Sequence, residues 1–281
     1  MVREVIKQTR GRRSRDGAGV NLVRVLGNGT VNAYDPFLML DSFDSSDPRD
    51  YEAGFPMHPH RGIETVSFIS KGQMLHRDHL GTEALVRDGE AQWLTAGSGA
   101  EHEEMPGGER LLGTQLWLNM PAKDKMKAKP AYHGITKDEI KEIPLKGGIL
   151  RLITGEYNGA EGWKGRYLPL DFYDIHLEPH ANAEISIRKG WSSFAFTLRG
   201  SVKISGTDVE EKTAAKLGDG DSVVLETGDT GAEILIYASK PLDEPVAWYG
   251  PIVMNTREEL EQAYLDLQNG TFIKEAEDYD N

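Results

Sequence analysis

Short β-rich runs separated by turn residues recur along most of this 281-residue chain, and they constrain its fold more than any other feature. Most runs are only three to eight residues long, which suits strands better than helices. Glycine and aspartate supply the turns between them, as in Gly218–Asp221 and Gly228–Gly231. Many short strands at such regular spacing are typical of a closed β-barrel or a β-sandwich. The sequence therefore predicts an all-β fold.

The pattern of strands occurs twice. Strand-like runs extend to Asn119 in the first half, and the pattern resumes at Ile149. Between them, Pro121–Pro130 is basic and bounded by prolines, as expected for the exit from a domain. Because the order of runs in the second half resembles the first, we predict two β domains in tandem, 1–130 and 131–281.

One helical pattern lies near the C-terminus. Thr256–Glu259 has the spacing of a capping box, and apolar residues then recur with helical period through Leu260–Leu267. Gly270 follows as a stop signal. We predict a short helix over about 256–268, packed on the β domains, followed by a frayed acidic tail at 275–281.

Charge and residue content narrow the classes of function. The net charge is −13 at pH 7, so the chain lacks the basic surface that direct binding to nucleic acid requires. There is no cysteine, which excludes disulfides, thiolate ligands and cysteine nucleophiles. No run approaches about 18 apolar residues, and Met1–Lys7 lacks the apolar part of a secretory signal. We therefore expect a soluble cytoplasmic protein, or a nuclear one in a eukaryote, with no membrane partner.

Two pairs of metal-ligand residues lie in the first half. His58 and His60 form one pair, and His102 and Glu104 form the other, each with i, i+2 spacing. Side chains two apart on a strand face the same way, about 7 Å apart along the strand. Two adjacent strands can therefore direct four ligands at one ion. Three imidazoles and a carboxylate suit Fe(II), Mn(II), Co(II), Ni(II), Cu(II) or Zn(II), whereas Mg(II) and Ca(II) prefer oxygen ligands.

The spacing leaves the identity of the carboxylate open. Glu64 lies four residues after His60 on the same side of the alternation, so either Glu64 or Glu104 can complete the site. His76 and His79 are three apart and face opposite sides of a strand, so we expect at least one of them to lie off the site.

The second half has no equivalent set of ligands. We interpret His176 and His180 as structural or surface groups, because Pro179 interrupts the strand that would align them. The sequence therefore predicts one metal ion per chain, held by the N-terminal domain.

Five stretches together resemble the pirin family, and the resemblance extends from about residue 16 to residue 270. The sequences His-Pro-His-Arg-Gly and His-x-Glu-Met-Pro are its most specific parts. The five stretches are Asp35–Asp41, Phe55–Glu64, Gln92–Gly97, His102–Pro106 and Tyr249–Thr256.

The resemblance implies a bicupin, in which one chain forms two antiparallel β-barrels. In pirins the N-terminal cupin holds one metal ion, usually iron, and the C-terminal cupin has lost its metal. The pirin ligands match His58, His60, His102 and Glu104 of this sequence. The resemblance therefore selects Glu104 as the carboxylate ligand, although Glu64 occupies the position used in the general cupin motif.

The resemblance also implies two kinds of function. Some bacterial pirins resemble quercetin 2,3-dioxygenases, which suggests a flavonol substrate, O₂ as co-substrate, bound Fe(II) and Glu104 as general base. Other members act as non-enzymatic, iron-dependent switches that bind a regulatory protein or a metabolic enzyme. The enzyme requires apolar walls around the ion, and the candidates for them are Phe55, Met57, Val66, Phe68, Leu94 and Met105.

Overall fold

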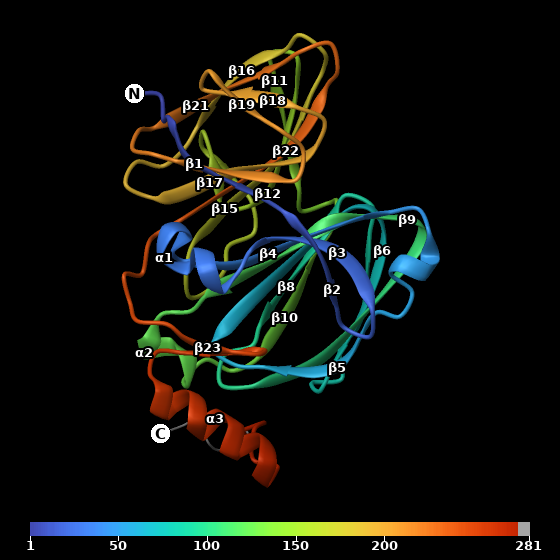
Figure 1. Ribbon diagram of the computed structural model, residues 1–281, viewed down its shortest axis with the longest axis vertical. Coiled ribbons are helices and arrows are strands. Elements are labelled where there is room, and N and C mark those ends of the chain that lie inside the picture. Colours follow the sequence, from blue (N-terminus) through green and yellow to red (C-terminus); the bar gives the residue numbers. More distant parts are fainter. Residues whose placement is uncertain (275–281) are drawn as a thin grey trace. The chain divides into compact units, whose positions relative to one another are not determined.

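The computed structural model describes residues 1–274, and these residues form two compact units built almost entirely from strands (Figure 1). One unit comprises Met1–Arg12, Val23–Pro36 and Ile135–Pro241, and we call it the seven-stranded unit after its main sheet. The other comprises Arg13–Leu22, Phe37–Gly134 and the chain from Leu242 onward, and we call it the nine-stranded unit. The predicted all-β fold is confirmed.

The seven-stranded unit contains a second, four-stranded sheet, and its hydrophobic core includes side chains from both sheets, such as Ile175 and Ile236 from one and Ile185 and Leu225 from the other. Exposed and buried positions alternate along Asn182–Ser186 of the smaller sheet, whereas Ala232–Ser239 of the main sheet is buried throughout. In spatial order, the main sheet is β1 (Val5–Arg10), β20 (Thr213–Leu217), β17 (Ser192–Arg199), β22 (Ala232–Ser239), β15 (Leu170–Leu177), β12 (Gly148–Thr154) and β11 (Lys141–Leu145). The smaller sheet is β16 (Asn182–Ser186), β21 (Ser222–Thr227), β18 (Val202–Ile204) and β19 (Thr207–Val209). The unit also includes η1 (Asn28–Thr30), α1 (Val31–Tyr34) and the hairpin of β13 (Glu156–Tyr157) and β14 (Ala160–Glu161).

The nine-stranded unit is organised around two unusually long strands. These are β6 (Ile63–Asp78) and β9 (Ala100–Asn119), which pair along nearly their whole length. The other strands of the nine-stranded sheet are β10 (Ala131–Ile135), β8 (Glu90–Thr95), β4 (Phe37–Ser45), β3 (Val20–Leu26), β2 (Arg12–Asp16), β5 (Phe55–His60) and β7 (Glu83–Arg87). The remaining elements are η2 (Pro48–Asp50), α2 (Ala122–Lys125), the hairpin of β23 (Ala247–Tyr249) and β24 (Ile252–Met254), and α3 (Arg257–Asn269).

A bulge interrupts the pairing of β6 and β9 midway. The register shifts between Ile69 and Lys71 and again between Lys71 and Gln73. Gly72 lies inside this bulge with φ +99°, and a Cβ there would come within 2.2 Å of the Arg110 carbonyl oxygen. Only glycine tolerates that conformation and that approach. The bulge separates the first half of β6, which pairs with β8, from the second half, which pairs with β7.

The ends of the chain differ from the predicted division into 1–130 and 131–281. Strand β1 pairs with β20, so the N-terminal residues belong to the seven-stranded unit. Helix α3 contributes Ala263 to a buried cluster with Ile252, Met254 and Phe272, so the C-terminal segment belongs to the nine-stranded unit. Hydrophobic periodicity shows that a residue is buried but not which neighbour buries it, and so it cannot reveal segments that pack outside their own half.

The predicted C-terminal helix is confirmed. Thr256 caps its N-terminus by accepting a hydrogen bond from the Glu259 backbone N–H, and Gly270 ends it in the left-handed conformation. The acidic tail at 275–281 lies outside the described residues. No helix within residues 1–274 is long and apolar enough to cross a membrane.

Candidate metal centre

Three neighbouring strands of the nine-stranded unit direct ligand-type side chains to one face of the sheet. His58 on β5 lies opposite His102 on β9, and on the other side of β9 the residue opposite His102 is Asp78 of β6. Two residues farther along the pair of β6 and β9, Glu104 lies opposite His76. Residues that oppose each other in an antiparallel pair share a face of the sheet. The register therefore brings the two predicted ligand pairs onto adjacent strands.

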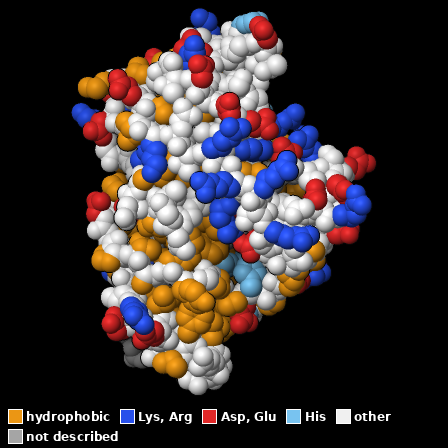
Figure 2. Space-filling model, viewed as in Figure 1, with side chains coloured by type: hydrophobic (Ala, Val, Ile, Leu, Met, Phe, Trp, Pro, Cys, Tyr) orange, Lys and Arg blue, Asp and Glu red, His pale blue; other side chains and the backbone are white. Residues whose placement is uncertain are grey.

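The three predicted imidazoles form a tight cluster. One nitrogen from each of His58, His60 and His102 lies within 4.8 Å of the other two. The ring centroids are 4.5 to 5.1 Å apart, with His58 closest to His102. His60 and His102 are buried and His58 is partly exposed. Histidine side chains also reach the surface beside an area of hydrophobic side chains on the face shown in Figure 2.

Backbone carbonyls fix the tautomers of two of these rings. The Nδ1–H of His58 donates to the Pro56 carbonyl at 2.8 Å, and that of His60 donates to the Pro251 carbonyl at 3.0 Å. Both Nε2 atoms then carry lone pairs, and they lie 3.1 Å apart. Two lone pairs at this separation repel each other unless a proton or a metal ion lies between them. The residues therefore fit a metal ion.

The third imidazole is left without hydrogen bonds. Both ring nitrogens of His102 are buried, and neither has a partner among the described residues. Burial, reinforced by the neighbouring His60 and His58, lowers the pKa of His102 well below its usual value. Burial and the adjacent His58 also lower the pKa of His60 to about 3. Both rings are therefore neutral near pH 7, the form in which imidazole binds a metal ion.

Glu104 lies on the same face but is held by amide and hydroxyl donors. Ser67 Oγ donates to Glu104 Oε1 at 2.8 Å and Gln92 Nε2 donates to it at 2.6 Å, while Gln115 Nε2 donates to Oε2. Tyr132 in turn donates its hydroxyl to Gln92 Oε1 at 3.1 Å. Three donors orient the carboxylate as an acceptor. In this side-chain conformation Glu104 is not part of the 4.8 Å cluster.

Glu64 points to the opposite face of the sheet. The turn at Gly62, with φ +78°, separates β5 from β6 and resets the alternation that would otherwise align Glu64 with His60. Glu64 Oε1 accepts hydrogen bonds from Trp93 at 3.0 Å and from Thr95 at 2.6 Å. Burial raises the pKa of Glu64 to about 7. The structure thus separates the two candidate carboxylates, and only Glu104 shares the face of the imidazoles.

His76 and Asp78 lie on the same face of the sheet as His102 and Glu104, and we call these residues together with His58 and His60 the array. The sequence analysis did not include His76 and Asp78 in the site. His76 Nε2 lies 3.0 Å from Asp78 Oδ2, and both side chains are fully buried. The His76 ring is 5.4 Å from that of His102 and stacks on Tyr132 at 4.3 Å. The spacing contained the signal, because His76 and Asp78 are themselves an i, i+2 pair. His79 lies off the site, where its ring accepts a hydrogen bond from the backbone N–H of Glu101.

The walls differ from the predicted apolar set. Alternation along β6 places Val66 and Phe68 on the face of Glu64, away from Glu104, and Met57 is half exposed. Leu94 shares the face of Gln92. Aromatic residues take the place of the missing apolar ones. The Trp117 ring lies 4.9 Å from His60 and 5.6 Å from Trp248, and Tyr132 covers His76.

The seven-stranded unit contains a second cluster of ligand-type residues, Asp174, His176 and Glu233, also within 4.8 Å. Here a cation of the protein itself is already bound, because Arg151 Nη1 donates to Asp174 Oδ2 at 2.8 Å. His176 Nε2 lies 3.0 Å from the same oxygen. We interpret this cluster as an ion-pair network, in agreement with the structural role predicted for His176.

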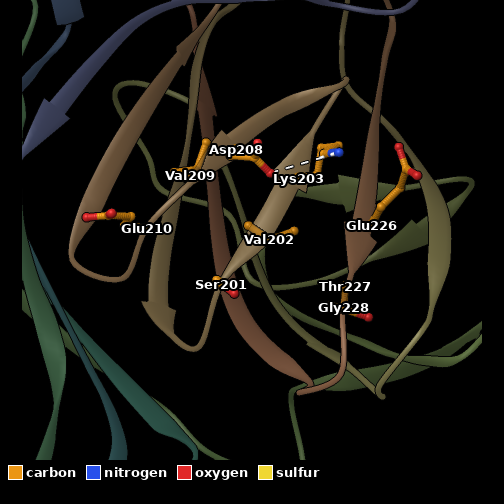
Figure 3. A pocket seen from close by; sticks show the side chains of 9 residues that line it. All are labelled: Ser201, Val202, Lys203, Asp208, Val209, Glu210, Glu226, Thr227 and Gly228. Carbon is orange, nitrogen blue, oxygen red and sulfur yellow. Dashed lines mark ion pairs between the residues drawn. The ribbon is translucent and has the colours of Figure 1, made fainter.

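A hollow of about 320 Å³ in the same unit is a weak candidate for a functional site (Figure 3). It is formed by strands β18, β19 and β21. The ion pair within it joins Lys203 to Asp208 at 4.0 Å, and both side chains are well exposed. Exposed pairs of this kind are screened by solvent and contribute little.

Comparisons with known proteins identify the family of this chain. The family model described as Pirin matches residues 19–118, and the model described as Pirin C-terminal cupin domain matches residues 172–273. A Pseudomonas aeruginosa protein named "Putative quercetin 2,3-dioxygenase" is 38% identical over 281 residues, covering 95% of this chain and 97% of its own. The chain belongs to the pirin family. Human pirin is also 38% identical over 265 residues, covering 92% of this chain and 90% of its own.

The solved structures place this pirin among the bicupins. The crystal structure of a quercetin 2,3-dioxygenase from Acinetobacter baumannii superposes with a TM-score of 0.88 at 29% identity, covering 97% of this chain and 99% of the other. Together with the two family models, this confirms the predicted pair of cupin domains and short C-terminal helix. The candidate metal centre lies in the nine-stranded unit, which contains most of the residues matched by the Pirin model.

Proposed function

We propose that this pirin is a metal-dependent dioxygenase that cleaves a flavonol such as quercetin with O₂. The observation that carries the proposal is the cluster of three imidazoles, His58, His60 and His102, beside the oriented carboxylate of Glu104. Relatives and a structural neighbour that bear the name of this activity support the choice of substrate class.

The proposed ligands are the three imidazoles, with Glu104 joining them when its side chain turns from the amides of Gln92 and Gln115 toward the ion. The resemblance to pirins favours Fe(II) as this ion, and three nitrogens with one oxygen are equally compatible with Zn(II), Mn(II), Co(II), Ni(II) and Cu(II). A bound ion of this kind supplies Lewis acidity to a hydroxyl oxygen and leaves positions open for exogenous ligands.

The chain's own residues supply the remaining requirements. In the orientation that Ser67 and Gln92 hold, Glu104 is the general base that accepts the proton of the flavonol hydroxyl. The rings of Trp117 and Tyr132 provide flat surfaces for an aromatic substrate beside the imidazoles. Burial of His60 and His102 restricts water on the inner side, so access is expected on the side of the partly exposed His58.

The test uses protein reconstituted anaerobically with Fe(II) and mixed with quercetin before O₂ is admitted. We expect consumption of quercetin and O₂ with release of CO from the opened ring, and loss of this activity in a folded His58→Ala variant. His180→Ala is the matched control, because His180 is an exposed histidine in the other unit.

The two buried glutamates allow a second, sharper test. Glu104→Gln is expected to weaken metal binding and abolish turnover, since it removes both charge and base. Glu64→Gln is the same substitution on the opposite face of the sheet and should keep the metal and most of the turnover. No quercetin consumption above the free-iron control, across several metals and flavonols, would favour the non-enzymatic iron switch with a protein partner instead.

A further inference from the structure

Each proposed imidazole ligand needs an acceptor for the ring N–H that faces away from the ion. Such an acceptor fixes the tautomer and orientation of the ring, and it strengthens the ring as a ligand. For His58 and His60 the acceptors are the carbonyls of Pro56 and Pro251. His102 has no such bond, although it is the most deeply enclosed of the three.

The unpartnered acceptor beside His102 is Nδ1 of His76. That atom is buried and makes no hydrogen bond among the described residues, and its ring centroid lies 5.4 Å from that of His102. A ring separation of this size is spanned by a direct N–H···N bond after a small rotation, or by one bridging water. His76 is also fixed in place, because Tyr132 stacks on it at an interplanar angle of 24°.

Asp78 determines which nitrogen of His76 is the acceptor. Asp78 Oδ1 accepts the backbone N–H groups of Leu80 and Thr82 at 2.9 and 3.0 Å, so the carboxylate acts as an acceptor throughout. The bond between Asp78 Oδ2 and His76 Nε2, 3.0 Å long, therefore has its proton on His76. In the neutral ring this leaves a lone pair on Nδ1, on the side that His102 can use.

We infer that His76, oriented by Asp78, is a positioning residue for the proposed metal ligand His102. The series Asp78–His76–His102 replaces the backbone carbonyl that serves each of the other two imidazoles, and it ends on a carboxylate held by two backbone N–H groups. Burial separates this role from substrate binding, because the side chains of His76 and Asp78 are fully enclosed. The inference rests on the proposed metal centre but not on any reaction there.

The test measures Co(II) binding by the full-length protein without substrate, using competition with a chelator and the visible absorption spectrum of the bound ion. His76→Phe keeps a ring against Tyr132 but removes the acceptor, so we expect Co(II) affinity to fall by about 10- to 100-fold with a changed spectrum. His79→Phe, three residues away and outside the array, is the matched control and should bind Co(II) as the wild type does.

Two further variants separate positioning from simple loss of packing. In Asp78→Asn the amide donates to His76 Nε2 and forces the proton onto Nδ1, so this variant should resemble His76→Phe although the ring is intact. His76→Gln offers both a donor for Asp78 and an acceptor for His102, so it should restore part of the affinity and the wild-type spectrum. Equal affinity and spectrum in His76→Phe and His79→Phe would overturn the inference. A wild-type protein that bound no Co(II) would overturn the metal centre itself.

Discussion

The two cupin domains carry clusters of ligand-type side chains that are equally compact but electrostatically opposite. In both, the potential ligand atoms lie within 4.8 Å of one another. In the cluster of His58, His60 and His102, burial lowers the pKa of His60 and of His102, so these two rings are uncharged near pH 7. In the other cluster Arg151 already binds Asp174. Burial alone would lower the pKa of His176, but its hydrogen bond to Asp174, together with the negative charges of Asp174 and Glu233, raises it.

This difference shows why compactness alone does not identify a metal site. A buried carboxylate that is paired with an arginine has its charge compensated and gains little from an added cation. Buried neutral imidazoles with facing lone pairs lack any compensating partner. Charge balance, which geometry alone does not reveal, therefore distinguishes the domain that is expected to bind metal from the one that is not.

The largest expected effect is on metal content. His102→Ala should reduce bound metal from about one ion per chain to nearly none, because it removes a central ligand. His176→Ala makes the same change in the other cluster and should leave the content unchanged. Elemental analysis of both purified variants measures this directly, and a loss of metal in His176→Ala instead would reverse the comparison.

Removing the arginine tests the second cluster. Arg151→Gln should lower the free energy of unfolding by about 3 kcal/mol, because it leaves the buried carboxylate of Asp174 without its cation. Arg77→Gln removes an arginine that pairs with Glu83 and Glu103 at the surface and should cost much less, because solvent screens exposed ion pairs. Urea denaturation of the two variants makes the comparison, and equal costs would show that Asp174 does not depend on Arg151.

Acid should destabilise the metal-free protein through the imidazole cluster. The pKa of His60 is lowered to about 3 on folding, so its contribution to stability is present above the unfolded pKa and is lost as pH falls. The loss is about 1.4 kcal/mol per pH unit below about 6.5 for each such ring. Urea denaturation of metal-free wild type and His60→Gln from pH 7 to pH 5 should show the shallower pH dependence in the variant, and parallel curves would contradict this assignment.

Much of this site could be predicted from the sequence because it depends on local spacing. The pairs His58/His60 and His102/Glu104 lie on adjacent strands as the two-residue period predicted. Glu64 shows the limit of that reasoning, because the alternation is valid only within one strand and the turn at Gly62 interrupts it.

The rest depends on contacts that no local pattern contains. His76 enters the array through strand pairing across the bulge, and Gln92 and Gln115 reach Glu104 from two different strands. The carbonyl that orients His60 belongs to Pro251, far along the chain. Long-range pairing of this kind follows from sheet topology, which periodicity does not determine.

The smallest expected effect is that of His176 on the pH dependence of unfolding. Folding raises the pKa of His176, so its contribution to stability is present below the unfolded pKa near 6.5. This contribution is lost as pH rises through the folded pKa. The pH dependence is therefore opposite in sign to that of His60. Because the side chain is 44% exposed, solvent screening limits the contribution to below about 1 kcal/mol. Comparing the pH dependence of unfolding for His176→Gln and His180→Gln measures it, and a change of the same sign as at His60 would contradict the assignment.

The most direct test of the account is to locate the ion. Crystals of protein loaded with Fe(II) should give one anomalous diffraction peak per chain, about 2.0–2.2 Å from a ring nitrogen of each of His58, His60 and His102. Glu104 should be turned toward the peak, and no peak is expected between Asp174, His176 and Glu233. A peak at that second cluster, or none at the three imidazoles, would contradict the claim that charge balance assigns the metal to the nine-stranded unit.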